Sequence, residues 1–204
     1  MIAIAAIVEI EKRLRACPET GLLTFFFFQS TIPEINSAVS ALRGVIYLLI
    51  EQRPGLIKHL RKRYDHAGDS MFSGPNVIDT LWLVLTDILQ DDTSLTTYIV
   101  LDALDECIEQ QEELVSLIVE SEMRPGSKVK WLLTSRNEPA IRERLQREDI
   151  CSNTSLEVNA RRVQQAVEKY ITAKVADLAK DKKYQEALRR EVERYLIDKA
   201  EGCG

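Results

Sequence analysis

Three carboxylates follow a short apolar run, and their spacing could serve metal and phosphate chemistry. Residues 98–101 predict a buried strand, Asp102 follows it directly, and Asp105 and Glu106 come shortly after. Ligands bind at the carboxyl ends of parallel strands, so Asp102 is expected at that edge of the sheet. There it could orient the water shell of a Mg²⁺ ion on nucleotide phosphates, while Asp105 and Glu106 polarise an attacking water. The alternative is that all three are loop acids that cap a helix starting near residue 108, where acidic side chains complement the helix dipole.

A hydroxyl and a guanidinium follow a second apolar run. Residues 129–133 predict another strand, and Thr134, Ser135 and Arg136 come next. A guanidinium matches phosphate geometry with two parallel hydrogen bonds, so Arg136 is suited to sensing a terminal phosphate. The alternative is that Arg136 pairs with a nearby carboxylate. Because both motifs fall at the same edge of a parallel sheet, together they favour a nucleotide site.

The elements that must carry these motifs alternate between strands and helices. Short apolar runs predict strands, and apolar residues at the helical period predict helices. We expect strands at 22–28, 97–101, 129–133 and 156–158. We expect helices at 1–15, 35–52, 56–66, 76–90, 108–122 and 138–147, one after Asn159 and a last one at 184–200, with Asn76 and Asn159 as N-caps. Strands that alternate with helices predict an α/β fold with a parallel sheet.

Composition excludes several classes of protein. Hydrophobic residues make up 45% of the 204 and charged residues 29%, which excludes a disordered or collagen-like chain. The 27 basic and 32 acidic side chains leave a net charge of −5, which argues against a nucleic-acid partner. No apolar run reaches the roughly 20 residues of a spanning helix, so we expect no membrane partner.

The cysteines and the first residues indicate a reducing, cytoplasmic location. Cys17, Cys107, Cys151 and Cys203 are far apart and form neither a metal signature nor a disulfide framework. Residues 1–8 are apolar but lack the basic residues that precede the apolar core of a secretory signal, and they continue directly into a helix pattern.

The two strand-end motifs also resemble a known family. Residues 102–107 together with residues 130–137 look like the NACHT-type NTPase module of fungal NOD-like receptor proteins, also described as a nephrocystin-like N-terminal domain. The resemblance implies a three-layer P-loop NTPase fold of the STAND class. Such a module is a nucleotide-dependent switch that oligomerises on activation. It implies Mg-ATP or Mg-ADP as cofactor, and self-association or other STAND proteins as partners.

The resemblance also implies a role for each residue of the two motifs. Asp102 would be the Walker B acid linked to Mg²⁺, and Asp105 and Glu106 would be the catalytic acids. Thr134 and Arg136 would be the nucleotide-sensing residues. A complete module of this kind would be an ATPase, and whether this chain hydrolyses nucleotide is left open.

One motif of the resembling family does not occur in the sequence. No GxxxxGK[ST] phosphate loop is found, and the resemblance would place that loop just before residue 1. We therefore expect a partial NTPase domain at 1–158, which lacks the first strand and the phosphate loop, and a helical extension at 159–204. The missing strand would lie between the strands near 156 and 129–133.

Two expectations follow from the missing loop. The chain alone should be poorly stable and should bind ATP weakly or not at all, so we expect it to be inactive as an ATPase. Its cofactor would be Mg-ATP or Mg-ADP, as in the resembling family, or it would bind none. The alternative function is a non-catalytic interaction or regulatory fragment that has lost nucleotide binding.

Overall fold

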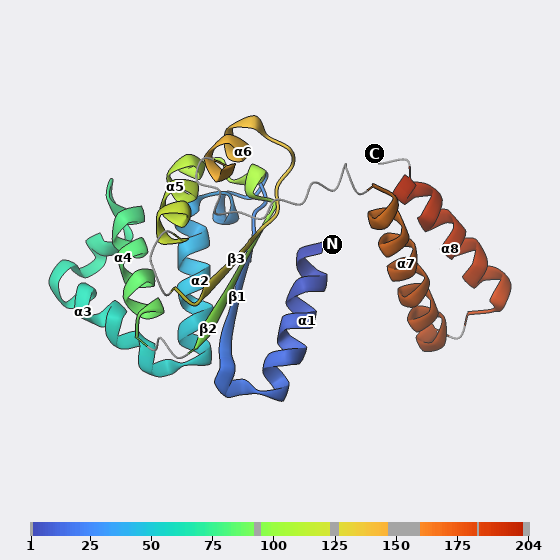
Figure 1. The fold of residues 1–204 in the computed structure, drawn as a ribbon, viewed down its shortest axis with the longest axis horizontal. Helices are drawn as coiled ribbons and strands as arrows, with labels where there is room; N and C mark the ends of the chain where they lie inside the picture. Colours follow the sequence, from blue (N-terminus) through green and yellow to red (C-terminus); the bar gives the residue numbers. More distant parts are fainter. Residues whose placement is uncertain (1, 92–94, 123–126, 147–159, 183, 202–204) are drawn as a thin grey trace. The chain divides into compact units, whose positions relative to one another are not determined.

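One parallel sheet of three strands carries both strand-end motifs. The computed structural model describes residues 2–91, 95–122, 127–146, 160–182 and 184–201. The strands are β1 (Gly21–Phe27), β2 (Thr96–Asp102) and β3 (Val129–Leu133), in the order β1-β2-β3, and both pairings are parallel. These strands confirm the first three predicted ones (Figure 1). The strand predicted at 156–158 lies outside the described residues.

Helices connect the strands in the order that the sequence predicts. The α-helices are α1 (Ile2–Ala16), α2 (Ala38–Gln52), α3 (Ile57–Ala67), α4 (Val77–Leu89), α5 (Gln111–Glu122), α6 (Pro139–Gln146), α7 (Ala160–Lys182) and α8 (Glu186–Glu201). Short 3₁₀ segments lie between these elements at η1 (Pro18–Thr20), η2 (Pro33–Ile35), η3 (Pro54–Leu56), η4 (Gly68–Phe72) and η5 (Leu104–Glu106).

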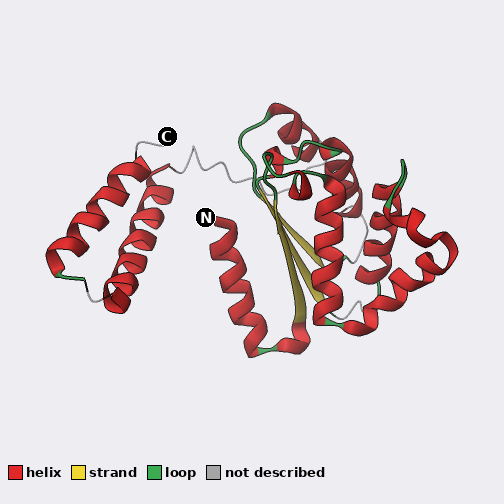
Figure 2. Ribbon diagram, turned by 180° about the vertical axis from the view of Figure 1, so that it is seen from behind, coloured by secondary structure: helices red, strands yellow, loops and turns green. Residues whose placement is uncertain are grey.

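The sheet separates two hydrophobic clusters, which makes three layers. On one face, Ala3 and Ile7 of α1 pack against Leu23 and Val100. On the other face, α2, α4 and α5 supply the larger cluster, which includes Ile99 of β2. Successive strand residues point to opposite faces, so each strand contributes to both clusters. Figure 2 shows α1 on one side of the sheet and the other helices of this part on the opposite side, which confirms the predicted α/β layers.

Helix α2 lies unusually close to β1. A Cβ added at Gly44 would lie 2.8 Å from Cδ2 of Phe26, so the helix approaches the strand at a residue without a side chain. The hydroxyl of Thr24, which is fully buried, donates to the backbone oxygen of Val45 at 3.1 Å. The loop between β1 and α2 follows the last residue of β1, so it lies at the carboxyl edge of the sheet.

Two helices begin three residues later than predicted, and one predicted N-cap makes no side-chain hydrogen bond. Helix α2 begins at Ala38 because the Ser37 hydroxyl caps it, accepting from the backbone N of Ser40 at 3.1 Å. Helix α5 begins at Gln111 because the residues before it bond to the loop ahead of α2: Ile108 N donates to Asn36 O at 2.7 Å. Asn76 occupies the predicted N-cap position of α4, but its side chain makes no capping hydrogen bond, and the other predicted N-cap, Asn159, lies outside the described residues.

The chain divides into two compact units, residues 1–151 and 152–204. Our sequence-based division at 158/159 falls among residues that the structure does not describe. In the second unit α7 and α8 pack on each other; Val175 is buried, and the Thr172 hydroxyl donates to Glu193 at 2.6 Å. Among the described helices, none combines the length and the apolar character needed to cross a membrane.

Candidate functional site

The register of the sheet brings both motifs to one edge. Phe27 is opposite Asp102, and Leu101 is opposite Leu133. The residues that follow each strand therefore emerge side by side, so that Thr134 comes next to Asp102. The carboxyl edge of the sheet is thus formed by three loops, residues 28–37, 103–110 and 134–138, which we call the edge loops.

Asp102 and Thr134 are joined directly across neighbouring strands. The Thr134 hydroxyl donates to Oδ1 of Asp102 at 2.5 Å and accepts from the backbone N of Ala103 at 3.0 Å. Ala103 adopts a left-handed backbone conformation, with φ 56° and ψ 51°, which is unusual for a residue with a Cβ. This conformation turns its N–H toward Thr134, so the loop is fixed at the point where Asp102 leaves the strand.

Asp105 and Arg136 form a second link between the same two loops. Oδ1 of Asp105 accepts from the backbone N of Arg136 at 2.9 Å, and Oδ2 lies 3.3 Å from its Nε. The Asp105 side chain is only 7% exposed, whereas that of Arg136 is 82% exposed. The pairing that we gave as the alternative for Arg136 is therefore present in this structure.

Glu106 points to the third edge loop. Its Oε2 accepts from the backbone N of Ser30 at 3.0 Å and from the Ser30 hydroxyl at 3.4 Å. Since α5 starts only at Gln111, neither Asp105 nor Glu106 caps that helix, and the loop-acid alternative does not describe their contacts. The acids instead tie the middle edge loop to its two neighbours.

Sequence reasoning missed Ser30 and Ala103. For Ser30 there was a usable signal, because the polar residues directly after the first strand must lie at the same edge as Asp102. For Ala103 no signal was usable, since an alanine does not favour the left-handed conformation that it adopts here. The edge therefore joins all five predicted site residues, and Ser30 and Ala103 complete it.

The acids fit a magnesium ion only if phosphates and water supply most of its ligands. No group of three or more His, Cys, Asp or Glu side chains among the described residues could hold a metal ion. Mg²⁺ on nucleotides commonly uses one or two carboxylates, with phosphates and waters filling its other positions. Asp102 suits that arrangement, because within the described part of the chain its Oδ2 accepts no hydrogen bond.

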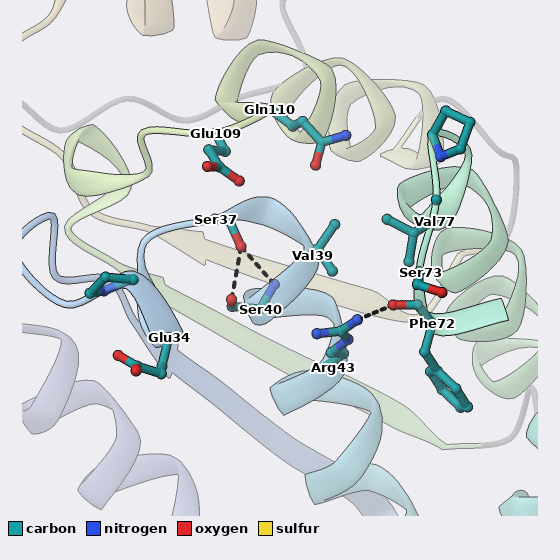
Figure 3. A pocket seen from close by; sticks show the side chains of 13 residues that line it. Glu34, Ser37, Val39, Ser40, Arg43, Phe72, Ser73, Val77, Glu109 and Gln110 are labelled. Atoms are coloured by element: carbon teal, nitrogen blue, oxygen red, sulfur yellow. Dashed lines mark hydrogen bonds between the residues drawn. The ribbon is translucent and has the colours of Figure 1, made fainter. Parts of the chain in front are cut away.

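A cavity of about 620 Å³ opens beside the start of α2 (Figure 3). It is lined by Pro33, Glu34, Ser37, Val39, Ser40, Arg43, Phe72, Ser73, Gly74, Pro75, Val77, Glu109 and Gln110. Two of its polar contacts join lining residues to one another: Ser37 bonds with Ser40, and the Arg43 guanidinium donates to the backbone oxygen of Phe72. It holds none of the predicted site residues, so we place the candidate site at the edge loops.

Comparison with protein-family models finds a match over two thirds of the chain. The family model described as nephrocystin 3, N-terminal, matches residues 1–136. The chain belongs to this family. The match includes every strand of the sheet and ends at Arg136, so it takes in all of the predicted site residues.

A curated protein is also similar to this chain over most of the chain's own length. Vegetative incompatibility protein HET-E-1 of Podospora anserina is 41% identical over 193 residues, which is 95% of this chain. The chain spans only 14% of the length of that relative. No solved structure matches the chain.

Proposed function

We propose that this nephrocystin 3 N-terminal domain is the metal- and sensor-side part of a NACHT-type nucleotide-binding signalling module. The observation that carries the proposal is the Asp102–Thr134 hydrogen bond. It places a carboxylate with an open oxygen and a hydroxyl together at the carboxyl edge of a parallel sheet, where ligands bind. The likeness to a vegetative incompatibility protein supports a signalling role.

The proposal gives each edge residue a role. Asp102 would hold Mg²⁺ through its open oxygen, and the ion would neutralise charge on the nucleotide phosphates. Thr134 and Arg136 would sense the nucleotide. The hydrolytic acid would be one of Asp105 and Glu106, which flank the same edge.

Weak binding by the chain is part of this proposal. The sequence contains no GxxxxGK[ST] loop, whose backbone N–H groups and Lys cradle the phosphates in P-loop proteins. Without that cradle, the edge loops supply a small share of the contacts to a nucleotide. We expect a Kd for Mg-ATP of roughly 0.1–1 mM, which corresponds to about 4–5.5 kcal/mol of binding free energy.

A second candidate is a non-catalytic interaction or regulatory fragment in a signalling assembly. It is favoured by the missing phosphate loop and by the Asp105–Arg136 pair, because each of these charges already has a partner within the chain. Self-association or binding to related signalling proteins would then be its activity.

An NMR titration of the ¹⁵N-labelled chain distinguishes the two candidates. Mg-ATP should shift the amides of Asp102, Ala103 and Thr134, and ATP with excess chelator should leave them unchanged. Saturable shifts confined to these edge amides support the nucleotide-binding module. Unchanged edge amides in a folded chain, with Mg-ATP in the millimolar range, would refute it and leave the interaction fragment.

A further inference from the structure

Asp105 and Glu106 are adjacent in the sequence but differ in what their carboxylates can still do. Both oxygens of Asp105 are engaged by Arg136, one by its backbone N and the other by its Nε. Only 7% of the Asp105 side chain is exposed. A buried carboxylate with both oxygens engaged by one residue is badly placed to accept a proton from water, since a general base must reach that proton.

Glu106 keeps one oxygen available. Both of its hydrogen bonds, from the N and the hydroxyl of Ser30, go to Oε2. Within the described residues, Oε1 has no hydrogen-bond partner. Of the two acids, Glu106 is therefore the one with a free acceptor at the edge.

The contacts with Asp105 also fix the direction of the Arg136 side chain. Asp105 contacts Arg136 at its backbone N and at Nε, the guanidinium nitrogen nearest the backbone. The described contacts leave both Nη groups unoccupied, and the side chain is 82% exposed. A free arginine side chain has about 2 kcal/mol of rotamer entropy, part of which is lost when it binds a phosphate. Contacts that already hold Nε reduce that loss.

From this geometry we infer that Asp105 is a positioning residue for Arg136. It holds the guanidinium by Nε so that the two Nη groups face the terminal phosphate of the nucleotide. This inference rests on the proposed function, and it removes Asp105 from the candidates for the hydrolytic acid. Glu106 is then the remaining acid.

The preference for ATP over ADP tests this inference in the full chain. A pair of charge-assisted hydrogen bonds to the terminal phosphate should favour Mg-ATP over Mg-ADP by about tenfold in Kd. Replacing Arg136 with Ala should abolish that preference. Asp105→Asn keeps the size of the side chain and an oxygen for the backbone N of Arg136, but it loses the negative charge beside Nε. Asp105→Asn should lower the logarithm of the ratio of the two Kd values, for Mg-ADP and Mg-ATP, by at least half as much as Arg136→Ala does.

Two further variants separate positioning from a general loss of structure. In Asp105→Asn/Arg136→Ala the preference should equal that of Arg136→Ala alone, because the two residues act as one unit. Asp91→Asn is the matched control. Asp91 also contacts basic side chains, the Lys58 ammonium and the His59 imidazole, but it follows α4 and precedes the amino end of β2. This control should keep the full preference.

The side-chain NMR signal of Arg136 Nε–H gives a readout without nucleotide. In the wild-type chain it should be sharp and slow to exchange, and in Asp105→Asn it should move to the position of a free arginine.

The outcomes separate the two proposals. A wild-type preference that Asp105→Asn retains while Arg136→Ala loses it would overturn the positioning role and leave the nucleotide-binding module standing. A folded chain that binds neither nucleotide would overturn the module, and the positioning role with it.

Discussion

Replacing Thr134 with Val should loosen the carboxyl edge measurably. Valine has nearly the same shape, but the change removes the hydroxyl that donates to Asp102 and accepts from the N–H of Ala103. A hydrogen bond to a charged group contributes about 1.5–3 kcal/mol and a neutral one about 0.5–1.5 kcal/mol. Both Thr134 and Asp102 are half-buried, so water replaces part of what is lost. We therefore expect the free energy of unfolding to fall by about 2 kcal/mol.

Urea unfolding followed by tryptophan fluorescence measures this change in the first unit alone. Both tryptophans, Trp82 and Trp131, lie in this unit and stack with ring centroids 6.1 Å apart. A loss of 2 kcal/mol lowers the urea midpoint by about 1 M at an m-value of about 2 kcal/mol/M.

The control for the valine variant is Thr134→Ser, which keeps the hydroxyl and loses only one methyl group. That loss should cost about 0.8 kcal/mol or less, since the site is half-buried. If the valine variant is no less stable than the serine variant, the hydroxyl does not hold the edge together and the argument fails.

Two further predictions concern the packing of the first unit. Gly44→Ala should destabilise the first unit by about 1–3 kcal/mol in the same urea assay, although Ala favours helices, because the new Cβ would lie 2.8 Å from the Phe26 ring. The control is Gly55→Ala, which should be nearly neutral because no atom lies within 4 Å of the added Cβ. Equal effects of the two substitutions would contradict the close approach of α2 to β1. Burial raises the pKa of the Cys107 thiol to about 12, so the thiolate fraction of Cys107 at pH 8 is about 10⁻⁴. After treatment with iodoacetamide, mass spectrometry should therefore find the exposed Cys17 alkylated long before the buried Cys107. Equal rates of alkylation would show that the native core opens readily.

Much of the fold could be predicted from the sequence because its signals are local. The run at 98–101 is apolar without alternation, which is typical of a strand covered on both faces, and β2 is indeed the central strand with a cluster on each side. The apolar period predicts the helices, and the largest errors, of three residues, are at the starts of α2 and α5. Those starts depend on contacts between loops, such as Ile108 N with Asn36 O, and no local pattern records them.

The candidate site was predictable in its members and less so in its pairings. The strand ends alone place Asp102 and Thr134 at one edge, because parallel strands end together. The hydrogen-bond partner of each acid depends on the backbone turn at Ala103, and the left-handed conformation of this residue cannot be predicted from the sequence. For this reason the sequence alone could not distinguish Asp105 from Glu106. In the structure their carboxylates contact different edge loops: Asp105 contacts Arg136, and Glu106 contacts Ser30.

The most direct test of the account is the affinity of the full chain for Mg-ATP, measured by isothermal titration calorimetry beside Asp102→Ala. The control is Asp79→Ala, which removes an exposed acid from the first turn of α4. We predict that the wild-type chain and the control bind Mg-ATP equally, and that Asp102→Ala binds at least about tenfold more weakly. Equal binding by all three folded proteins, or no binding by any of them, would contradict a nucleotide site built on Asp102.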